Sequence, residues 1–309
     1  MATVEPRSPM TASRNVVAEK YIAVDELVEQ YRRQLGIEVS RFFRGLRTIS
    51  LYRCRDTGLR FYHPLGAEGD EAFYQGLQHF PWYYLPWKWE HKIACRYVGQ
   101  NKRVLEIGCG RGDFLARIRQ TGAVCRGLEL NPDAVGLARS KGLDVTQTSL
   151  EQHSRLSPGS YDMVCAFQVL EHVSAVGDFL RGCGNMLPIG GTLVLSVPNN
   201  DSYIRHIRWD VLNMPPHHQG LWDRQSLMAV QSHFQFELRS IHLEPLQYPH
   251  EVAKYYATQL ERLRSRQDLL GAFARRLSGT PTRQLASLGI RLLRRAIRGD
   301  TVLAVYTKT

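Results

Sequence analysis

The sequence predicts an α/β fold built on a parallel, doubly wound sheet. In KRVLEIGCGRGDFLARIR, residues 102–119, a short apolar run turns through three glycines and continues with apolar residues at helical spacing. Further apolar runs follow in CRGLEL, GLDVTQT, YDMVCAF and GTLVLSVP, each separated from the next by a helical stretch or a loop. This alternation is typical of parallel strands with helices packed on both faces of the sheet.

A glycine loop follows the first of these strands. Gly108, Gly110 and Gly112 have GxGxG spacing, and Asp113 stands where a dinucleotide fingerprint would require a glycine. About 20 residues further on, the second strand ends at Glu129, whose carboxylate can accept hydrogen bonds from both hydroxyls of a ribose. Together these features indicate a sheet of the nucleotide-binding type.

The same patterns divide the rest of the chain. We expect a disordered tail over 1–20, then a helix, a β element and an aromatic segment over 21–90. The core is expected over 91–249 together with 300–309, and a basic helical cap over 250–299. The closing run TVLAVYTK is a strand alone after a long helical stretch, so it must return to the sheet to bury its face.

The net charge of +11 is unevenly distributed. Residues 101–250 hold 14 Lys and Arg against 14 Asp and Glu, whereas residues 251–309 hold 12 against 4. A nucleic-acid function would therefore depend on the flanks. No apolar run reaches the ~18 residues of a membrane span, and no signal peptide is recognisable, so we expect a cytoplasmic protein. The six cysteines have no paired spacing and are interpreted as free thiols.

Five motifs together indicate a family. VLEIGCGRGDFL, LELN, YDMVCAFQVLEHV, LPIGGTLVLSVPN and VLAVYTK resemble class I S-adenosylmethionine-dependent methyltransferases, in particular the branch of the ubiquinone-biosynthesis O-methyltransferases. The resemblance covers about residues 90–245 and the last eight residues. It implies a Rossmann-like sheet of seven strands in the order 3-2-1-4-5-7-6, with the last strand antiparallel. An N-terminal α+β extension and a helical insertion before the last strand would be added to this core.

The resemblance also implies a role for residues of each motif. The glycine loop would let the backbone approach the methionine part of S-adenosyl-L-methionine, where a Cβ would intrude. Glu106 would hold the amino group, Glu129 the ribose, and the segment at Ser149 the adenine, although the family often has an acidic residue there. The expected cofactor-binding residues are Glu106, Gly108, Cys109, Gly110, Gly112, Glu129, Leu130, Ser149, Leu150, Phe167 and Gln168.

Each of these residues has a simpler interpretation. The glycines could serve a tight turn alone, Glu129 could be a surface carboxylate, and Cys109 is more readily a small residue that fits than a nucleophile.

Three histidines are candidates for the general base that a hydroxyl acceptor would require. His172 follows the fourth strand, and His217 and His218 lie in NMPPHHQGLW after the fifth, so both segments are on the carboxyl edge. Related quinone methyltransferases carry Glu-x-x-Glu-His at the first site, linked to metal and membrane binding, whereas this chain has Gln168 in place of the first Glu. The histidine pair lacks partner ligands at a suitable spacing, so we expect no metal. Each histidine could instead be purely structural.

The flanks suggest substrate contacts. Basic amphipathic segments of the cap, 281–298 above all, suit an anionic or lipid-linked acceptor or a membrane surface, although a solvated helix face is the commoner case. YRCRDTG, residues 52–58, resembles half of a zinc knuckle, but its one cysteine cannot hold zinc, so we expect a metal-free β element. The aromatic residues that follow, from Phe80 to Trp89, would pack the N-terminal helix or contact substrate.

These observations predict an S-adenosylmethionine-dependent methyltransferase. The expected acceptor is a small molecule, methylated on a hydroxyl of a sugar, glycolipid, quinone or secondary metabolite. The alternatives are an RNA methyltransferase or nucleic-acid binder acting through the basic flanks, and a cofactor-binding scaffold without catalysis. Nucleic acid is not the expected partner, because no D/N-PP-Y/F sequence follows the fourth strand.

Overall fold

The central sheet has the predicted architecture. The structure is a computed structural model that describes residues 5–80, 85–247, 249–268, 272, 294 and 296–309. Its seven-stranded sheet has the order β10-β11-β8-β7-β4-β5-β6, which confirms the predicted order 3-2-1-4-5-7-6. The terminal strand β11 pairs antiparallel with both β10 and β8, and the other pairs are parallel. The strands are β4 (Arg103–Ile107), β5 (Val124–Leu128), β6 (Val145–Thr146), β7 (Met163–Phe167), β8 (Thr192–Pro198), β10 (Phe236–Pro245) and β11 (Arg298–Lys308).

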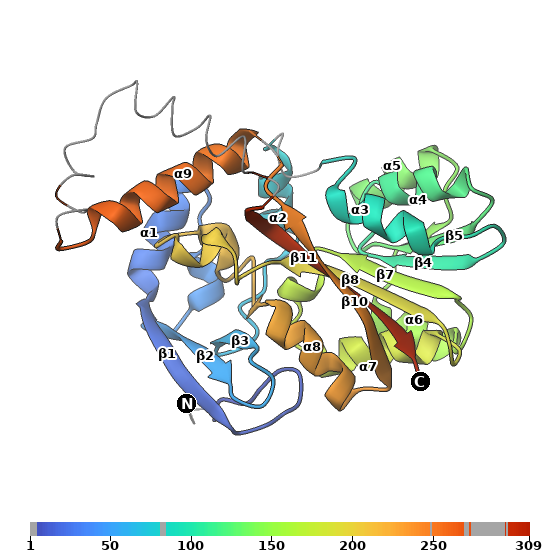
Figure 1. Ribbon diagram of the computed structural model, residues 1–309, viewed down its shortest axis with the longest axis horizontal. Coiled ribbons are helices and arrows are strands. Elements are labelled where there is room, and N and C mark those ends of the chain that lie inside the picture. Colours follow the sequence, from blue (N-terminus) through green and yellow to red (C-terminus); the bar gives the residue numbers. More distant parts are fainter. Residues whose placement is uncertain (1–4, 81–84, 248, 269–271, 273–293, 295) are drawn as a thin grey trace.

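Helices cover both faces of this sheet (Figure 1). On one face, a buried cluster joins the strands to α3 (Trp89–Ala94), α4 (Asp113–Arg119) and α5 (Pro132–Ser140). On the other, a second cluster joins them to α6 (Leu150–Leu156), α7 (Val176–Met186) and α8 (Arg224–His233). The strands are therefore buried on both sides, as their continuous apolar runs predict.

Two glycines allow the tight turn between β4 and α4. Gly108 and Gly112 have φ of 68° and 71°, in the left-handed region that disfavours other residues. A Cβ on Gly108 would lie 2.5 Å from a methyl of Val169, and one on Gly112 would lie 2.4 Å from a methyl of Leu143. Both glycines are therefore required by the turn and its packing, whatever binds above it.

The N-terminal residues form a second, four-stranded sheet. Its order is β1-β2-β3-β9, and β9 comes from far along the chain. The strands are β1 (Val16–Ala23), β2 (Thr48–Cys54), β3 (Arg60–His63) and β9 (Gly220–Leu221), with α1 (Val24–Leu35), η1 (Ser40–Phe43) and α2 (Glu71–Gln78) beside them. The YRCRDTG segment forms the β2–β3 hairpin, with Cys54 and Thr57 buried in it.

The expectation of a disordered tail over 1–20 is wrong for its described part. Residues 16–23 pair antiparallel with β2, and Met10, only 1% exposed, packs in the same buried cluster as Leu59 and Trp222. The Pro9 carbonyl accepts a hydrogen bond from the amide of Gly177 in α7. The sequence did not predict this order, because the segment has few apolar residues and they are buried only by contact with distant parts of the chain.

A buried segment joins the two sheets. It comprises residues 211–222, from the short turn η5 (Val211–Asn213) to β9, and follows the turn η4 (Tyr203–His206). The Tyr31 hydroxyl, on α1, makes a bifurcated hydrogen bond to the carbonyls of Val211 (2.5 Å) and Met214 (2.9 Å). The Gln219 side chain donates to the Ala67 carbonyl at 2.9 Å. The N-terminal unit thus positions the histidine-containing loop.

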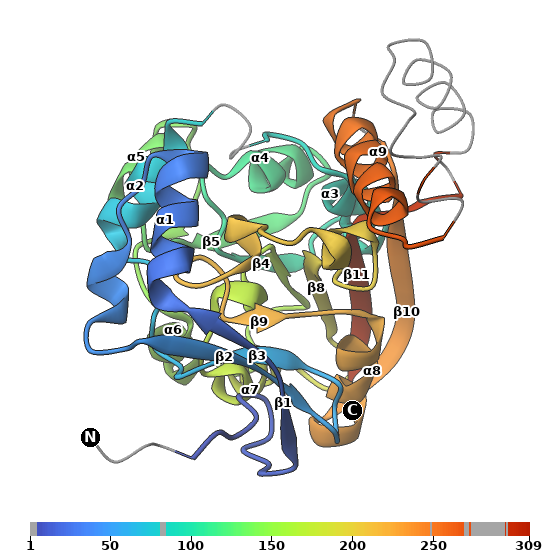
Figure 2. The same ribbon diagram turned by 90° about the vertical axis from the view of Figure 1, so that its left-hand side faces the viewer.

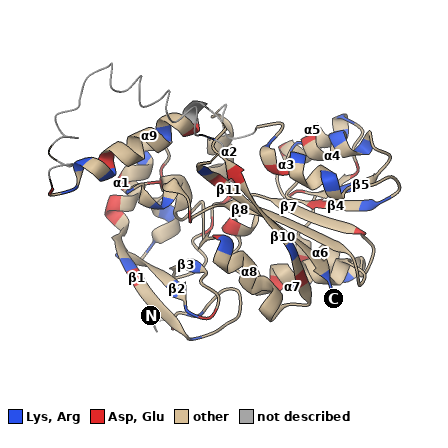
Figure 3. Ribbon diagram, viewed as in Figure 1, with Lys and Arg blue, Asp and Glu red and all other residues tan. Residues whose placement is uncertain are grey.

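Part of the expected cap is described. Helix α9 (Pro249–Arg264) lies between β10 and β11 in sequence and beside the end of β11 in space (Figures 1 and 2). It carries both signs of charge (Figure 3), and its Tyr255 ring contacts Tyr203 edge-on at 5.6 Å. Residues 273–293, which hold much of the predicted basic surface, lie outside the described residues, as do aromatic residues 82–84. No helix in the described ranges combines the length and apolar character of a membrane span.

The Tyr31 anchor can be tested by removing one atom. We expect Tyr31→Phe to lower the free energy of unfolding by ~1–3 kcal/mol, because the Val211 carbonyl loses a buried donor. Denaturant unfolding measures this. Tyr21→Phe is the control, since Tyr21 is 69% exposed and should leave stability unchanged. Equal stability of both variants would contradict the anchoring role.

Candidate active site

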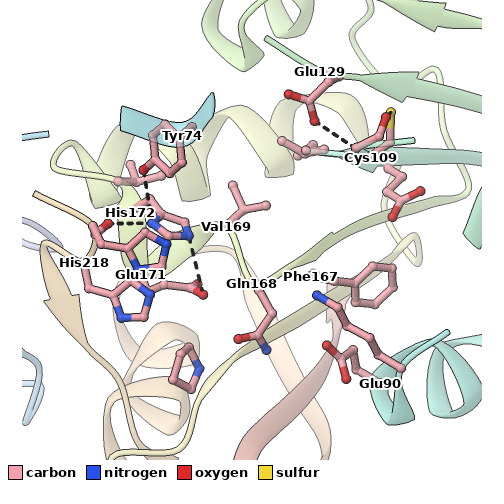
Figure 4. Close-up of a pocket in the computed structure, with 18 of the residues that line it drawn as sticks. Tyr74, Glu90, Cys109, Glu129, Phe167, Gln168, Val169, Glu171, His172 and His218 are labelled. Carbon is pink, nitrogen blue, oxygen red and sulfur yellow. Dashed lines mark hydrogen bonds and ion pairs between the residues drawn. The ribbon is translucent and has the colours of Figure 1, made fainter. Parts of the chain in front are cut away.

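A large cavity lies over the carboxyl edge of the parallel strands. Its volume is about 900 Å³, and its walls come from the seven-stranded sheet, from α2, α3 and α9, and from the segment that carries η4 and η5 (Figure 4). All the predicted cofactor residues line it except Gly112, which is the N-cap of α4. The three predicted histidines line it as well. The cavity is therefore continuous from the glycine loop to the histidine loop.

Glu106 is an unsatisfied buried acid at the floor of this cavity. It is 4% exposed, and its Oε2 has no hydrogen-bond partner within the part of the chain that the structure describes. Burial, and secondarily the Glu129 carboxylate, raise the pKa of Glu106 well above its usual range, while the Lys88 ammonium opposes the shift. A buried carboxyl oxygen without a hydrogen-bond partner can accept a hydrogen bond from the ammonium group of a ligand.

Glu129 supports the glycine loop. Its Oε2 accepts a hydrogen bond from the Gly110 amide at 2.8 Å, and its Oε1 accepts from the amides of Leu130 (2.8 Å) and Asn131 (2.9 Å). The carboxylate therefore bridges the ends of β4 and β5 and stays at the cavity wall (Figure 4). The interpretation as a mere surface carboxylate is wrong, since three backbone amides hold it in place.

The adenine and methionine ends have different environments. Ser149 is the N-cap of α6 and its hydroxyl accepts from the Gln152 amide, so that hydroxyl is already engaged. Gln168, at the end of β7, has a φ of 57°, a left-handed conformation uncommon for a residue with a side chain. The Phe167 ring packs on Phe114 and His91 at 4.9 and 5.0 Å. Strained backbone at a cavity wall is typical of functional positions.

The three histidines form one cluster. The ring centroid of His172 lies 4.6 Å from that of His217 and 4.9 Å from that of His218, and the latter two rings stack at 4.5 Å. Burial lowers the pKa of His172 to about 4, and burial, with the neighbouring imidazoles, lowers the pKa values of His217 and His218 well below their usual range. All three imidazoles are therefore neutral near pH 7. The expectation that the pair lacks partner ligands is wrong, because the fold brings His172 to it.

Several cavity residues were missed by the sequence analysis. Lys88 precedes α3, and Glu171 is buried next to His172. A carboxyl cluster of Glu244, Glu251 and Asp300 has oxygens within 4.8 Å of one another at the far end. Only Glu171 was detectable from sequence, as the neighbour of a predicted residue. The carboxyl cluster draws on β10, α9 and β11, so only tertiary structure could assemble it.

The cavity wall is predominantly acidic. Eleven carboxyl side chains line it against three cationic ones. The acids are Glu71, Glu90, Glu106, Asp113, Glu129, Glu151, Glu171, Asp210, Glu244, Glu251 and Asp300, and the cations are Lys88, Arg111 and Lys254. Burial raises the pKa of Glu106, Glu171 and Glu244, so these three carboxyls are largely neutral near pH 7, but the other eight still outnumber the cations. This balance favours ligands that carry positive charge and disfavours polyanions.

Comparison with known proteins identifies the family of the chain. The family profile for a methyltransferase domain matches residues 83–241, slightly more than half of the chain. The chain belongs to the methyltransferase domain family. Ubiquinone biosynthesis O-methyltransferases of Xanthomonas campestris and Sodalis glossinidius are 34% and 30% identical over 113 and 107 residues. These matches cover 35% and 33% of this chain and 47% and 43% of the relatives, so the chain spans about half the length of the curated relatives it matches.

Solved methyltransferases resemble the fold partially. A SAM-dependent methyltransferase from Archaeoglobus fulgidus has a TM-score of 0.48 at 19% identity, covering 71% of this chain and 90% of that protein. A geranyl diphosphate C-methyltransferase from Streptomyces coelicolor has a TM-score of 0.46 at 14% identity, covering 71% and 80%.

The cofactor of this methyltransferase is S-adenosyl-L-methionine, and the cavity residues fit it. The unsatisfied Glu106 oxygen suits the ammonium of its methionine part, and an acidic wall suits its sulfonium charge. Glu129, with two oxygens at the end of β5, suits the ribose hydroxyls.

Removal of the Glu129 carboxylate should weaken cofactor binding. We expect Glu129→Ala to raise the Kd for S-adenosyl-L-methionine ~10- to 100-fold, because charged hydrogen bonds to the ligand and to the Gly110 amide are lost. Calorimetric titration measures the change. Asp178→Ala, at a 64% exposed side chain on α7, is the control. Absence of binding by the unaltered protein would contradict the assignment of the cavity.

Glu244 should make stability depend on pH. Burial raises its pKa to about 9, above the ~4.3 of an unfolded chain. The folded protein then binds more protons than the unfolded chain between these values, so stability falls as pH rises from about 4.3 to about 9. We expect Glu244→Gln to flatten this fall, with Glu237→Gln on the same strand as the control. The free energy of unfolding is measured at pH 5 and pH 8 for the unaltered protein and both variants. An equal fall in all three proteins would contradict the raised pKa of Glu244.

Proposed function

We propose that this chain methylates a hydroxyl oxygen of a small-molecule acceptor, of the sugar, glycolipid, quinone or secondary-metabolite classes. The observation that carries the proposal is the cluster of three neutral histidines on the same cavity as the glycine loop. A hydroxyl must lose its proton as it is methylated, and neutral imidazoles are suited to receive it. The O-methyltransferase names of the partial relatives support the same reaction class.

The roles divide along the cavity. When bound, S-adenosyl-L-methionine supplies an electrophilic methyl group on a sulfonium. Glu106, Glu129 and the glycine loop orient the donor, and Gln168 faces its methionine end. His172, His217 or His218 receives the proton of the acceptor hydroxyl. Positioning of this kind can lower the barrier by ~7–11 kcal/mol, and proton transfer can add ~10²- to 10⁴-fold in rate.

The charge of the cavity narrows the acceptor. The basic flanks suit an anionic acceptor as one alternative, but the excess of carboxyl groups over cations on the wall argues for a neutral or cationic one. A lipid-linked acceptor remains compatible if its charged part stays outside the cavity. Peripheral membrane contact through 281–298 stays a proposal, because most of that segment lies outside the described residues.

The nucleic-acid alternative has less support. A phosphate backbone is attracted by a basic surface, whereas the cavity wall is acidic and the described helix α9 carries both signs of charge. A scaffold without catalysis would not explain why the histidines gather beside the cofactor residues.

Acceptor screening tests the proposal. The purified chain is incubated with S-adenosyl-L-methionine and pairs of hydroxyl compounds and their deoxy counterparts from the four classes, and release of demethylated cofactor is measured. We expect turnover only with a hydroxyl compound. His172→Gln, His217→Gln or His218→Gln should slow it by ~10²-fold or more with cofactor affinity unchanged.

His233→Gln, at an exposed position on α8, is the matched control. If none of the three cavity substitutions slows turnover, the histidines are structural. If RNA but no small hydroxyl compound is methylated, the nucleic-acid alternative replaces the proposal.

A further inference from the structure

The histidine cluster brings together three imidazoles, although accepting one proton requires a single imidazole. His172 comes from the turn η3 (Leu170–His172) after β7, and His217 and His218 come from the loop before β9. One ligand nitrogen of each ring lies within 4.8 Å of those of the other two. Three imidazoles from two separate segments therefore gather at one point of the cavity wall.

Hydrogen bonds select the same tautomer in each ring. The Nδ1 of His172 lies 2.6 Å from the His217 carbonyl, and the Nδ1 of His217 lies 2.7 Å from the Leu212 carbonyl. The Nδ1 of His218 lies 3.1 Å from the side-chain oxygen of Asn213. Carbonyl oxygens only accept, so each Nδ1 carries the proton and each Nε2 carries a lone pair.

The orientation of Asn213 is itself fixed. Its amide nitrogen donates to the side-chain oxygen of Asn200 at 2.7 Å, so its oxygen is the atom that faces His218. Outer hydrogen bonds of this kind, from Nδ1–H to an oxygen, are the arrangement found around histidines that ligate metals.

Glu171 adds a carboxyl group to the cluster. It is 1% exposed, and its Oε2 has no hydrogen-bond partner among the residues described. Its Oε1 lies 3.9 Å from the Nε2 of His172 (Figure 4). A buried Glu171 oxygen without a donor, beside the His172 ring, is a group that a bound cation would satisfy.

We propose that His172, His217 and His218 bind a divalent transition-metal ion, Zn²⁺ or an ion of similar preference, beside Glu171. Imidazole nitrogens prefer such ions over Mg²⁺ or Ca²⁺, which take oxygen ligands. Three protein nitrogens leave a further position open toward the cavity, as in catalytic zinc sites. That position suits the acceptor oxygen, because a metal ion acidifies a bound hydroxyl, whose proton would then pass to water. In the metal-bound form the histidines would act as ligands and would not receive that proton. This assignment, unlike the site itself, rests on the proposed function.

Binding requires a small rearrangement. Tetrahedral zinc with bonds of ~2.1 Å holds its nitrogens ~3.4 Å apart, whereas the ligand nitrogens here lie within 4.8 Å of one another, so the rings must approach by up to ~1.4 Å. The rings of His217 and His218, now stacked with an angle of 19° between planes, must also turn so that their lone pairs converge.

Metal binding can be measured without any methylation assay. The tag-free chain is stripped with a chelator and titrated with Zn²⁺ against a chromophoric competitor, with Mg²⁺ in a parallel titration. We expect one equivalent of Zn²⁺ and no competition by Mg²⁺. His172→Gln, His217→Gln and His218→Gln should each weaken Zn²⁺ binding ~100-fold or more, whereas the exposed His233→Gln should leave it unchanged.

A measurement on the unaltered chain guards against variants that fail to fold. X-ray absorption of the Zn²⁺ form should show three imidazole nitrogens, and fewer than three would overturn the site. Equal Zn²⁺ affinity in all four variants would overturn it too. Histidine-dependent Zn²⁺ binding supports the site even if no hydroxyl is methylated, whereas methylation by a chain that binds no Zn²⁺ overturns the site and leaves the proposed function standing.

Discussion

The segment 211–222 is buried between two sheets, and the rest of the site depends on this burial. The Tyr31 hydroxyl donates to two of its carbonyls, the Gln219 side chain donates to the Ala67 carbonyl, and β9 completes the N-terminal sheet. The Gln219 amide also donates to the Glu171 carbonyl at 2.8 Å, which ties this segment to the turn after β7. Without these contacts His217 and His218 would have no fixed relation to His172.

The same arrangement explains why the N-terminal unit is part of the enzyme. A parallel sheet with a glycine loop can hold a cofactor, but it leaves the carboxyl edge open to solvent on the acceptor side. Here that side is closed by α2, by the buried segment and by α9, which contribute Tyr74, Leu212 and Lys254 to the cavity wall. Closure lowers the local polarity, which is the cause of the shifted pKa values of Glu106, Glu171 and the histidines.

The charge of the cavity wall differs in sign from the charge of the flanks. The excess of basic residues is compatible with an anionic partner, yet the cavity that we assign to the cofactor is lined by carboxyl groups. Net charge describes the whole surface, whereas a cavity's preference depends on the few side chains that face it. Lys88 is one of the few cations there, and its charge opposes the effect of burial on Glu106 and Glu171.

The amino-acid sequence by itself determined the sheet, its strand order through a family resemblance, the glycine loop and Glu129. These features depend on neighbours within one strand–turn–helix unit, so local periodicity carries them. Tertiary structure alone decided three things: the pairing of residues 16–23 with β2, the meeting of His172 with His217 and His218, and the carboxyl cluster of Glu244, Glu251 and Asp300. Each of these joins segments far apart in the chain, and spacing along a sequence contains no information about distances that only folding creates.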